Sequence, residues 1–97
     1  MSKFAIVARN DDQTRNNWYF VVRLERDCKV TTTDSWSRSI ETKKYKKGSY
    51  FIECQANFQN APISYVSIDN ELANELIQMC NESVIDYHKR VEEYLYT

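Results

Sequence analysis

The sequence contains only one glycine, Gly48, and only one histidine, His88. Phosphate-binding loops such as Walker A and the G-x-G-x-x-G turn need several glycines, because the backbone must approach the phosphate closely. Two-histidine metal sites and H-E-x-x-H zinc helices need a second histidine. The sequence therefore excludes these nucleotide-binding and zinc-enzyme motifs.

Long apolar runs are also missing. The apolar runs at residues 4–8 and 18–22 are each five residues long. The core of a signal peptide needs about 7 to 15 apolar residues, and a membrane-spanning helix needs about 20. We therefore expect a cytoplasmic protein with no membrane contact.

The three cysteines, Cys28, Cys54 and Cys80, form no C-x-x-C motif and are too few for a disulfide framework. Cys54 and Cys80 fall at apolar positions of an expected strand and an expected helix, where a free thiol packs as a small hydrophobic group. We expect reduced and buried cysteines, no metal site and no cofactor.

The chain has 97 residues, 42% of them hydrophobic and 13% aromatic. That is enough for one small core and leaves little room for a second domain. We predict a single compact domain over residues 1–97, with strands in 1–68 and a helix in 69–97. Runs rich in β-branched and aromatic residues, several of them alternating with polar ones, predict the strands. The expected strands are 4–9, 18–24, 28–33, 49–58 and 63–68.

Two parts of the strand region carry more specific expectations. Residues 25–27 predict a tight turn that pairs 18–24 with 28–33 as a hairpin. In 34–48, Trp36, Arg38 and Ile40 alternate with serines, which allows a short strand. Residues 43–48, rich in lysine and ending in glycine, are expected to form a loop.

From residue 69 the apolar spacing changes to that of a helix. Asp69 is a good N-cap, and Glu71 in the first turn favours the helix dipole. Apolar residues then recur at steps of four and three, a heptad pattern, at Ala73, Ile77, Cys80, Val84, Tyr87, Val91 and Tyr94. We predict one long helix, with a possible break at 81–83, packed across an antiparallel sheet of four or five strands.

A continuous helix over 70–96 would be about 40 Å long, whereas a seven-residue strand covers about 23 Å. The second half of the helix would then extend beyond the sheet and need a partner. A second copy of the chain, a target protein or a fold-back of the helix would each supply one. We favour a homodimer whose seam consists of Val84, Tyr87, Val91, Tyr94 and Leu95.

Charge is divided unevenly along the chain, although the formal net charge is only -1. Residues 1–50 carry eleven Lys and Arg against six Asp and Glu, a net of +5, and residues 51–97 have a net of -6. Such a division indicates charged partners. It equally fits basic strands and an acidic helix that attract each other within the fold.

The basic run at 43–47 is the best candidate for a nucleic-acid site. Lysine contacts phosphates, and nearby aromatic rings can stack on unpaired bases. A solvated loop with no ligand is the alternative interpretation. The candidate residues are Lys43, Lys44, Lys46 and Lys47.

Aromatic residues lie on both faces of the expected strands, because Trp18 alternates with Tyr19, and Tyr50 with Phe51. One face must expose its rings unless another segment, such as 34–48, covers it. Exposed tyrosine and tryptophan beside arginine are typical of binding hot spots. The candidate partner-binding residues are Tyr19, Arg23, Trp36, Arg38, Tyr45 and Phe51.

No catalytic set is recognisable in the sequence. His88 lies between Tyr87 and Lys89 and is expected at the surface of the helix, away from any nucleophile. The paired carboxylates at 11–12 and at 25 and 27 lie in turn-like segments where such residues are common. We therefore predict a protein that is not an enzyme.

A short, glycine-poor chain with many aromatics, divided charge and no catalytic set resembles, at the level of class, the small inhibitors made by phages and mobile elements. Anti-CRISPR proteins and toxin-immunity proteins are examples. The resemblance implies a non-enzymatic protein that blocks a bacterial protein or nucleoprotein complex by direct contact. The alternative is a small nucleic-acid-binding protein that uses the basic segment.

Overall fold

The computed structural model describes residues 3–9, 17–34, 39–56 and 63–96. The strands are β1 (Phe4–Ala8), β2 (Asn17–Leu24), β3 (Cys28–Thr33), β4 (Ile40–Tyr45), β5 (Tyr50–Ala56) and β6 (Ser64–Ile68), followed by helices α1 (Asn70–Glu82) and α2 (Val84–Tyr96). Strands followed by helices confirm the predicted α+β class. Neither of these helices is long and apolar enough to cross a membrane.

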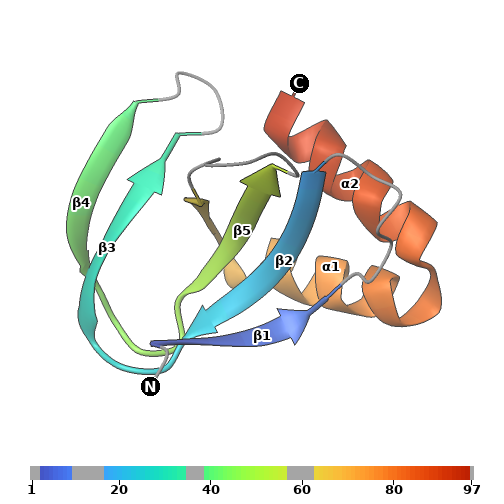
Figure 1. Cartoon of the computed structure of the whole chain (residues 1–97). Helices are drawn as coiled ribbons and strands as arrows, with labels where there is room; N and C mark the ends of the chain where they lie inside the picture. Colours follow the sequence, from blue (N-terminus) through green and yellow to red (C-terminus); the bar gives the residue numbers. More distant parts are fainter. Residues whose placement is uncertain (1–2, 10–16, 35–38, 57–62, 97) are drawn as a thin grey trace.

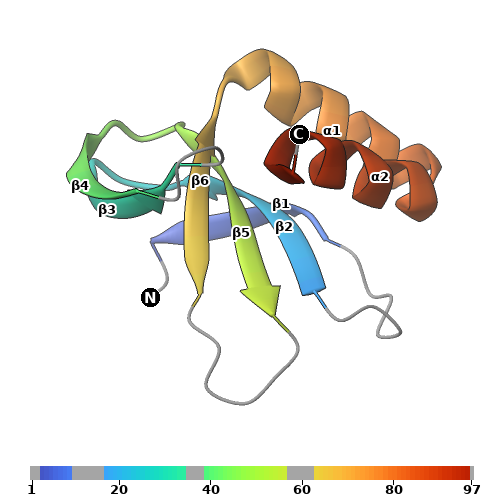
Figure 2. The same ribbon diagram turned by 90° about the horizontal axis from the view of Figure 1, so that it is seen from above.

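Four strands form one antiparallel sheet in the order β1-β2-β5-β6. Within the described residues, β3 and β4 pair only with each other, and we call this two-stranded unit the ribbon. Figure 1 shows the ribbon on one side of the sheet and both helices on the other side. Figure 2 shows the same layers from above.

The ribbon continues the pairing of β2 with β5 around a bend. The last pair of β2 with β5 and the first pair of β3 with β4 are five residues apart on both strands, so the register is kept. At the bend, Leu24 N donates to Ser49 O at 2.8 Å and Gly48 N donates to Leu24 O at 2.8 Å. Gly48 has a φ of 96°, a conformation that glycine adopts at no steric cost.

Two sequence predictions about this region are wrong. Residues 18–24 do not pair with 28–33, because β2 lies between β1 and β5 while β3 pairs with β4. Residues 43–45, expected in a loop, belong to β4, and the turn lies at residues 46–49. Lysines suggested a loop, but an edge strand accepts them where their side chains reach solvent.

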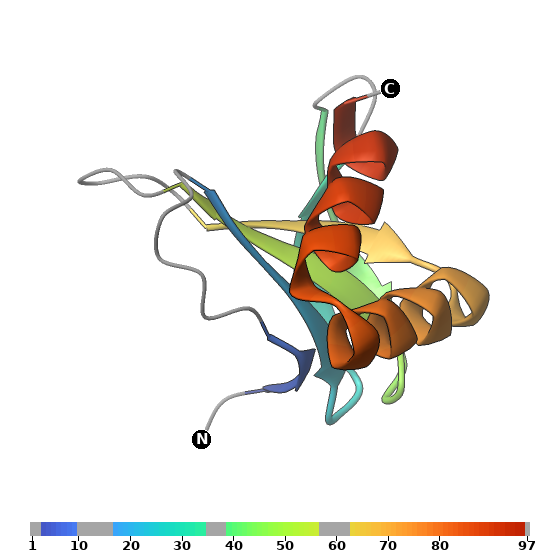
Figure 3. The same ribbon diagram turned by 90° about the vertical axis from the view of Figure 1, so that its right-hand side faces the viewer.

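A break at Ser83 replaces the single helix predicted over 70–96. Ser83 is extended, with φ -156° and ψ 118°. Its N–H donates to Met79 O at 2.7 Å at the end of α1, and its Oγ accepts from Asp86 N at 3.3 Å at the start of α2. Helix α2 changes direction there and stays on the sheet (Figure 3). A straight helix of about 40 Å would exceed the longest dimension of the molecule, 33 Å.

The buried side chains form two clusters, one on each face of the sheet. On the helix side, Tyr19, Val21 and Ile52 pack with residues of α1 and α2. On the ribbon side, Val22, Leu24, Phe51 and Val30 form the second cluster, with Cys28, Tyr45, Phe4, Phe20 and Tyr65 packed around it. Alternate residues of β2 therefore face opposite layers, as the sequence pattern predicts.

Candidate functional site

The two faces of the ribbon differ in chemistry. Residues directly opposite each other in an antiparallel pair share a face. Cys28, Val30 and Tyr45 face the core, so their neighbours along each strand face outward. The outward pairs are Lys29–Lys44, Thr31–Thr42 and Thr33–Ile40. This face carries two cations and three hydroxyl groups, and none of its six side chains is a carboxylate.

Cations from three separate segments gather where the ribbon bends. Lys3 Nζ donates to Lys29 O at 3.3 Å, and Lys3 O accepts from Glu25 N at 2.8 Å, so the N-terminal segment lies against the bend. Lys47 N donates to Asp27 Oδ1 at 2.7 Å, which joins the two turns. We call the resulting surface the basic corner. Its cations are Lys3, Arg26, Lys29, Lys44, Lys46 and Lys47.

The two carboxylates near the basic corner are already engaged. Glu25 Oε1 accepts from Arg23 Nη2 at 3.1 Å, and this hydrogen bond raises the pKa of Arg23. Asp27 accepts the backbone N–H of Lys47. The five lysines and one arginine of the corner outnumber these two acids, and all six but Lys3 are exposed.

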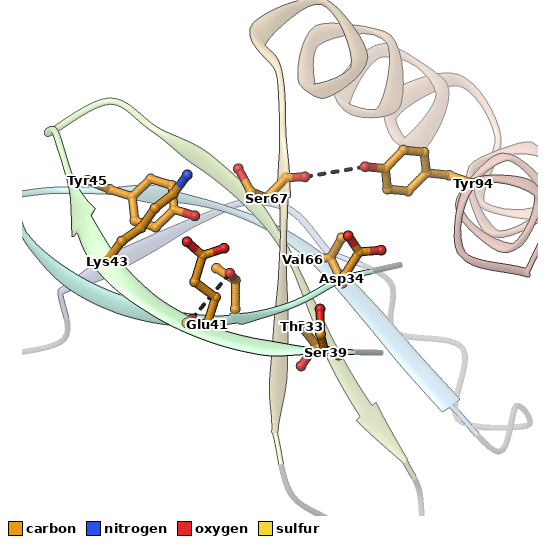
Figure 4. A pocket seen from close by; sticks show the side chains of 10 residues that line it. Thr33, Asp34, Ser39, Glu41, Lys43, Tyr45, Val66, Ser67 and Tyr94 are labelled. Atoms are coloured by element: carbon orange, nitrogen blue, oxygen red, sulfur yellow. Dashed lines mark hydrogen bonds between the residues drawn. The ribbon is translucent and has the colours of Figure 1, made fainter. Parts of the chain in front are cut away.

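A groove of about 310 Å³ lies between the ribbon, β6 and α2. Figure 4 shows Lys43 over the Tyr45 ring at one end, with the Lys43 Nζ 5.2 Å from the ring centroid. Glu41 and Asp34 line its other parts, and Tyr94 Oη donates to Ser67 O at 3.3 Å across its helix side. The groove combines one cation, two carboxylates and several hydroxyls, a lining that suits a polar ligand.

The predicted aromatic interface is wrong for Tyr19 and Phe51. Tyr19 is 2% exposed and Phe51 is 0% exposed, because the helices cover one and the ribbon covers the other. Tyr45 is half-buried, with its ring 4.9 Å from that of Phe51, and Arg23 is half-buried on the sheet. Trp36 and Arg38 lie outside the described residues.

The basic segment predicted from the sequence is exposed, but its members divide between two places. Lys44, Lys46 and Lys47 belong to the basic corner, whereas Lys43 lines the groove on the inward face. Sequence reasoning missed Lys3, Arg26 and Lys29, because only the strand register and the fold of the N-terminal segment bring them beside residues 44–47.

Most residues of the predicted dimer seam pack against the core of their own chain. Tyr87 and Val91 are completely buried in the cluster beneath the helices. Tyr94 and Leu95 are half-buried against the same cluster, and Val84 is exposed. The helix folds back, so the interpretation of these residues as one exposed seam is wrong for Tyr87 and Val91.

His88 is buried, not at the surface as expected. Its ring lies 6.2 Å from the Tyr19 ring and 5.6 Å from the Tyr87 ring, centroid to centroid. The break at Ser83 turns this face of α2 toward the sheet. In the continuous helix predicted from the sequence, the same face would lie in solvent. His88 is thus part of the packing between α2 and β2.

Burial raises the pKa of two further groups in the fold. Burial raises the pKa of the Cys54 thiol from 9.0 to about 11. Burial also raises the pKa of Tyr65, whose hydroxyl donates to Glu53 Oε1 at 2.8 Å. Cys28, Cys54 and Cys80 form no disulfide, and each is half-buried. Within the described ranges, no group of three His, Cys, Asp or Glu side chains is placed to hold a metal ion.

The helices form the acidic end of the molecule and neutralise part of their own charge. Arg90 of α2 pairs with Glu75 of α1, with Nε to Oε1 at 3.1 Å and Nη2 to Oε2 at 3.4 Å. The hydrogen bonding to Glu75 raises the pKa of Arg90.

Comparison of the chain with known protein families, curated proteins and solved structures gave no match.

Proposed function

We propose that this chain is a non-enzymatic nucleic-acid-binding protein that contacts phosphates through the basic corner. The clustering of six cations from three chain segments around the bend carries the proposal. Lysine and arginine neutralise phosphates and release condensed counterions, which supplies most of the affinity of non-specific binding. Glu25 is paired with Arg23, and Asp27, bound to the neutral N–H of Lys47, offsets only one of the six charges, so the corner stays positive.

The shape of the ribbon supports double-stranded DNA as the ligand. The major groove of B-DNA admits a two-stranded β-ribbon. The outward pair Lys29–Lys44 would lie close to phosphates, and the pair Thr31–Thr42 would present hydroxyl groups beside them. These two threonines lie with their Oγ1 atoms 2.7 Å apart, which leaves each oxygen able to make a further hydrogen bond.

The opposite charge of the two ends orients the molecule in this proposal. The helices carry Glu71, Glu75, Glu82, Asp86, Glu92 and Glu93 against Lys89 and Arg90. Phosphates would repel this end and attract the basic corner. The charge division found in the sequence then corresponds to one binding surface and one surface that faces away from the nucleic acid.

Fluorescence anisotropy with a labelled duplex tests the proposal. The triple variant Lys44→Ala/Lys46→Ala/Lys47→Ala should bind at least about tenfold more weakly at about 100 mM salt, because three phosphate contacts are lost. Lys89→Ala is the matched control, since Lys89 is an exposed lysine on α2, and its affinity should stay equal to or above that of the wild type. Equal affinity of the triple variant and the wild type would contradict the proposal.

A second candidate function is the inhibitor of a bacterial protein or nucleoprotein complex that the sequence suggested. The observation that favours it is a depression of about 320 Å³ beside β3, whose lining includes Ile40 and Ile63. These side chains are 75% and 51% exposed, and exposed apolar groups beside a depression are typical of protein-binding surfaces.

Affinity capture from a bacterial lysate tests this second candidate. The wild-type chain and an Ile85→Asp control, altered at an exposed position of α2, should retain the same protein, and Ile40→Asp should lose it. If no protein is retained above a blank resin, or if Ile40→Asp retains it equally well, the inhibitor proposal fails at this surface.

A further inference from the structure

Among the described strands, the outer edge of β4 has no paired neighbour. Within the described residues β4 pairs only with β3. Asp34 N donates to Ser39 O at 2.9 Å, so every second pair from there, including Thr32 with Glu41, exchanges hydrogen bonds within the ribbon. The intervening residues Ile40, Thr42 and Lys44 therefore direct their N–H and C=O groups outward, away from β3.

This edge lacks the usual protection against strand pairing. Of the two outer strands of the four-stranded sheet, β6 lies beside β3 of the ribbon. Strand β1 is irregular between Ile6 and Ala8, and a bulge of this kind discourages further pairing. Strand β4 keeps a regular register over all six of its residues and contains no proline. Its lysines are the single remaining deterrent, since charges on an edge oppose the approach of a like edge.

We propose that β4 pairs with β4 of a second copy of this chain, antiparallel about a two-fold axis at Thr42. In this register Glu41 lies opposite the partner's Lys43, and Lys43 lies opposite the partner's Glu41. The lysine that would deter other edges is thus matched by a carboxylate in this one. Lys44 lies opposite the partner's Ile40, so that its aliphatic stem covers a side chain that is 75% exposed in the single chain.

Charge and hydrogen-bond direction together select this register. A shift of the two-fold axis to residue 41 places Glu41 opposite itself, and a shift to residue 43 places Lys43 opposite itself. Like charges directly opposite each other destabilise an antiparallel pair. An axis between two residues would align outward-directed N–H groups with inward-directed ones, which breaks the hydrogen bonds. Thr42 is the one centre near the middle of β4 that avoids both conflicts.

The resulting dimer has a continuous four-stranded sheet made from two ribbons. Its outward face carries the pair Lys29–Lys44 and the pair Thr31–Thr42 twice, on either side of the two-fold axis. A single strand pair buries less area than a standard stable interface, about 1,600 Å², so dimerisation is concentration-dependent. The inference does not depend on nucleic-acid binding, because it uses only the edge of β4.

Charge reversal tests the proposed register, with mass followed by light scattering and sedimentation over a series of protein concentrations. Glu41→Lys alone places lysines opposite lysines, and Lys43→Glu alone places glutamates opposite glutamates. Each single variant should dimerise at least about tenfold more weakly than the wild type. The double variant Glu41→Lys/Lys43→Glu restores both opposite-charge pairs and should regain the wild-type dimer.

A mixture of the two single variants gives the sharpest result, because a Glu41→Lys chain and a Lys43→Glu chain are complementary at both positions. The mixture should form a heterodimer at concentrations at which each component alone stays monomeric. Circular dichroism of each variant confirms that the single chain is folded. A wild type that is monomeric at every concentration, or single variants that dimerise as well as the wild type, would overturn the proposal; the latter result would place the dimer at another surface, such as α2.

Discussion

Tyr87 combines the largest buried aromatic ring of α2 with a buried hydrogen bond. Its ring is fully buried, and its hydroxyl donates to Tyr19 O at 2.8 Å. Tyr87→Phe keeps the ring and removes the donor, so the Tyr19 carbonyl loses this partner. We expect the free energy of unfolding to fall by about 1 to 3 kcal/mol, measured by urea denaturation.

The matched control for Tyr87→Phe is Tyr94→Phe. The Tyr94 hydroxyl makes the same kind of bond, to Ser67 O, but at the solvent-exposed groove. Water can replace that donor, so the loss should be less than about 1 kcal/mol. An equal effect of the two substitutions would contradict the burial of the Tyr87 hydroxyl.

Cys54 makes the stability of the folded chain depend on pH. Burial raises its pKa from 9.0 to about 11, so the folded chain holds the thiol proton more tightly than the unfolded chain does. The resulting stability is complete below about pH 9 and is lost as the pH rises toward 11. At pH 8 the thiolate is about a hundredfold scarcer than in an ordinary cysteine, and alkylation should be slow to the same degree.

Alkylation rates of the three cysteines, measured by mass spectrometry of digested protein, check this expectation. Cys54 in the folded chain should react far more slowly than Cys54 in urea. The Cys54→Ala variant should lose less stability than the wild type between pH 9 and 10. Rapid labelling of Cys54 at pH 8 in the folded chain would contradict the raised pKa of its thiol.

The sequence predicts the burial of a residue correctly where neighbouring residues set its contacts. It predicts burial wrongly where a distant segment of the chain does so. Alternation in β2 correctly separated Tyr19 and Val21 from Val22 and Leu24, because strand geometry alone sets the two faces. The exposure of Tyr19 and Phe51 was predicted wrongly, since it depends on which distant segment covers each face. His88 was misplaced for the same reason: its burial follows from the turn at Ser83.

At the scale of elements, Ser83 decides whether there are one or two helices. Its Oγ accepts from Asp86 N at 3.3 Å and caps α2. Ser83→Ala removes this acceptor and should lower the free energy of unfolding by about 1 kcal/mol. Ser67→Ala, at an exposed strand serine, is the control and should change it by less than about 0.5 kcal/mol. Identical midpoints for wild type and Ser83→Ala in urea would argue against the cap.

The elements that the sequence predicted well have strong local signals. Strands β1, β2, β3 and β6 lie within one residue of their predicted bounds, and Asp69 caps α1 with Oδ1 accepting from Leu72 N at 2.7 Å. The prediction of one long helix was wrong, although the break falls within residues 81–83, where the sequence allows one. A heptad pattern keeps the same spacing when the helix breaks and turns back onto the core, so the pattern alone does not distinguish one helix from two. Strand β4 was missed because its lysines hide the alternation that identifies a buried strand.

At the scale of the whole molecule, the charge division of the sequence becomes a division in space. The ribbon and its bend carry the basic corner, and α1 and α2 carry most of the acids of the second half. The sequence alone groups three residues of this corner, Lys44, Lys46 and Lys47, because they lie within four positions of one another in the chain. It could not add Lys3 and Lys29, since their proximity depends on the bend and on the hydrogen bond from Lys3 Nζ to Lys29 O.

The salt dependence of duplex binding tests the central claim, that the basic corner binds phosphates, most directly. About five neutralised phosphates, at about -0.9 each, predict a slope of about -4.5 when the logarithm of the binding constant is plotted against the logarithm of salt concentration. The variant Lys44→Ala/Lys46→Ala/Lys47→Ala should give a shallower slope of about -2. No binding by the wild type at about 50 mM salt, or a slope that the three substitutions leave unchanged, would contradict the account.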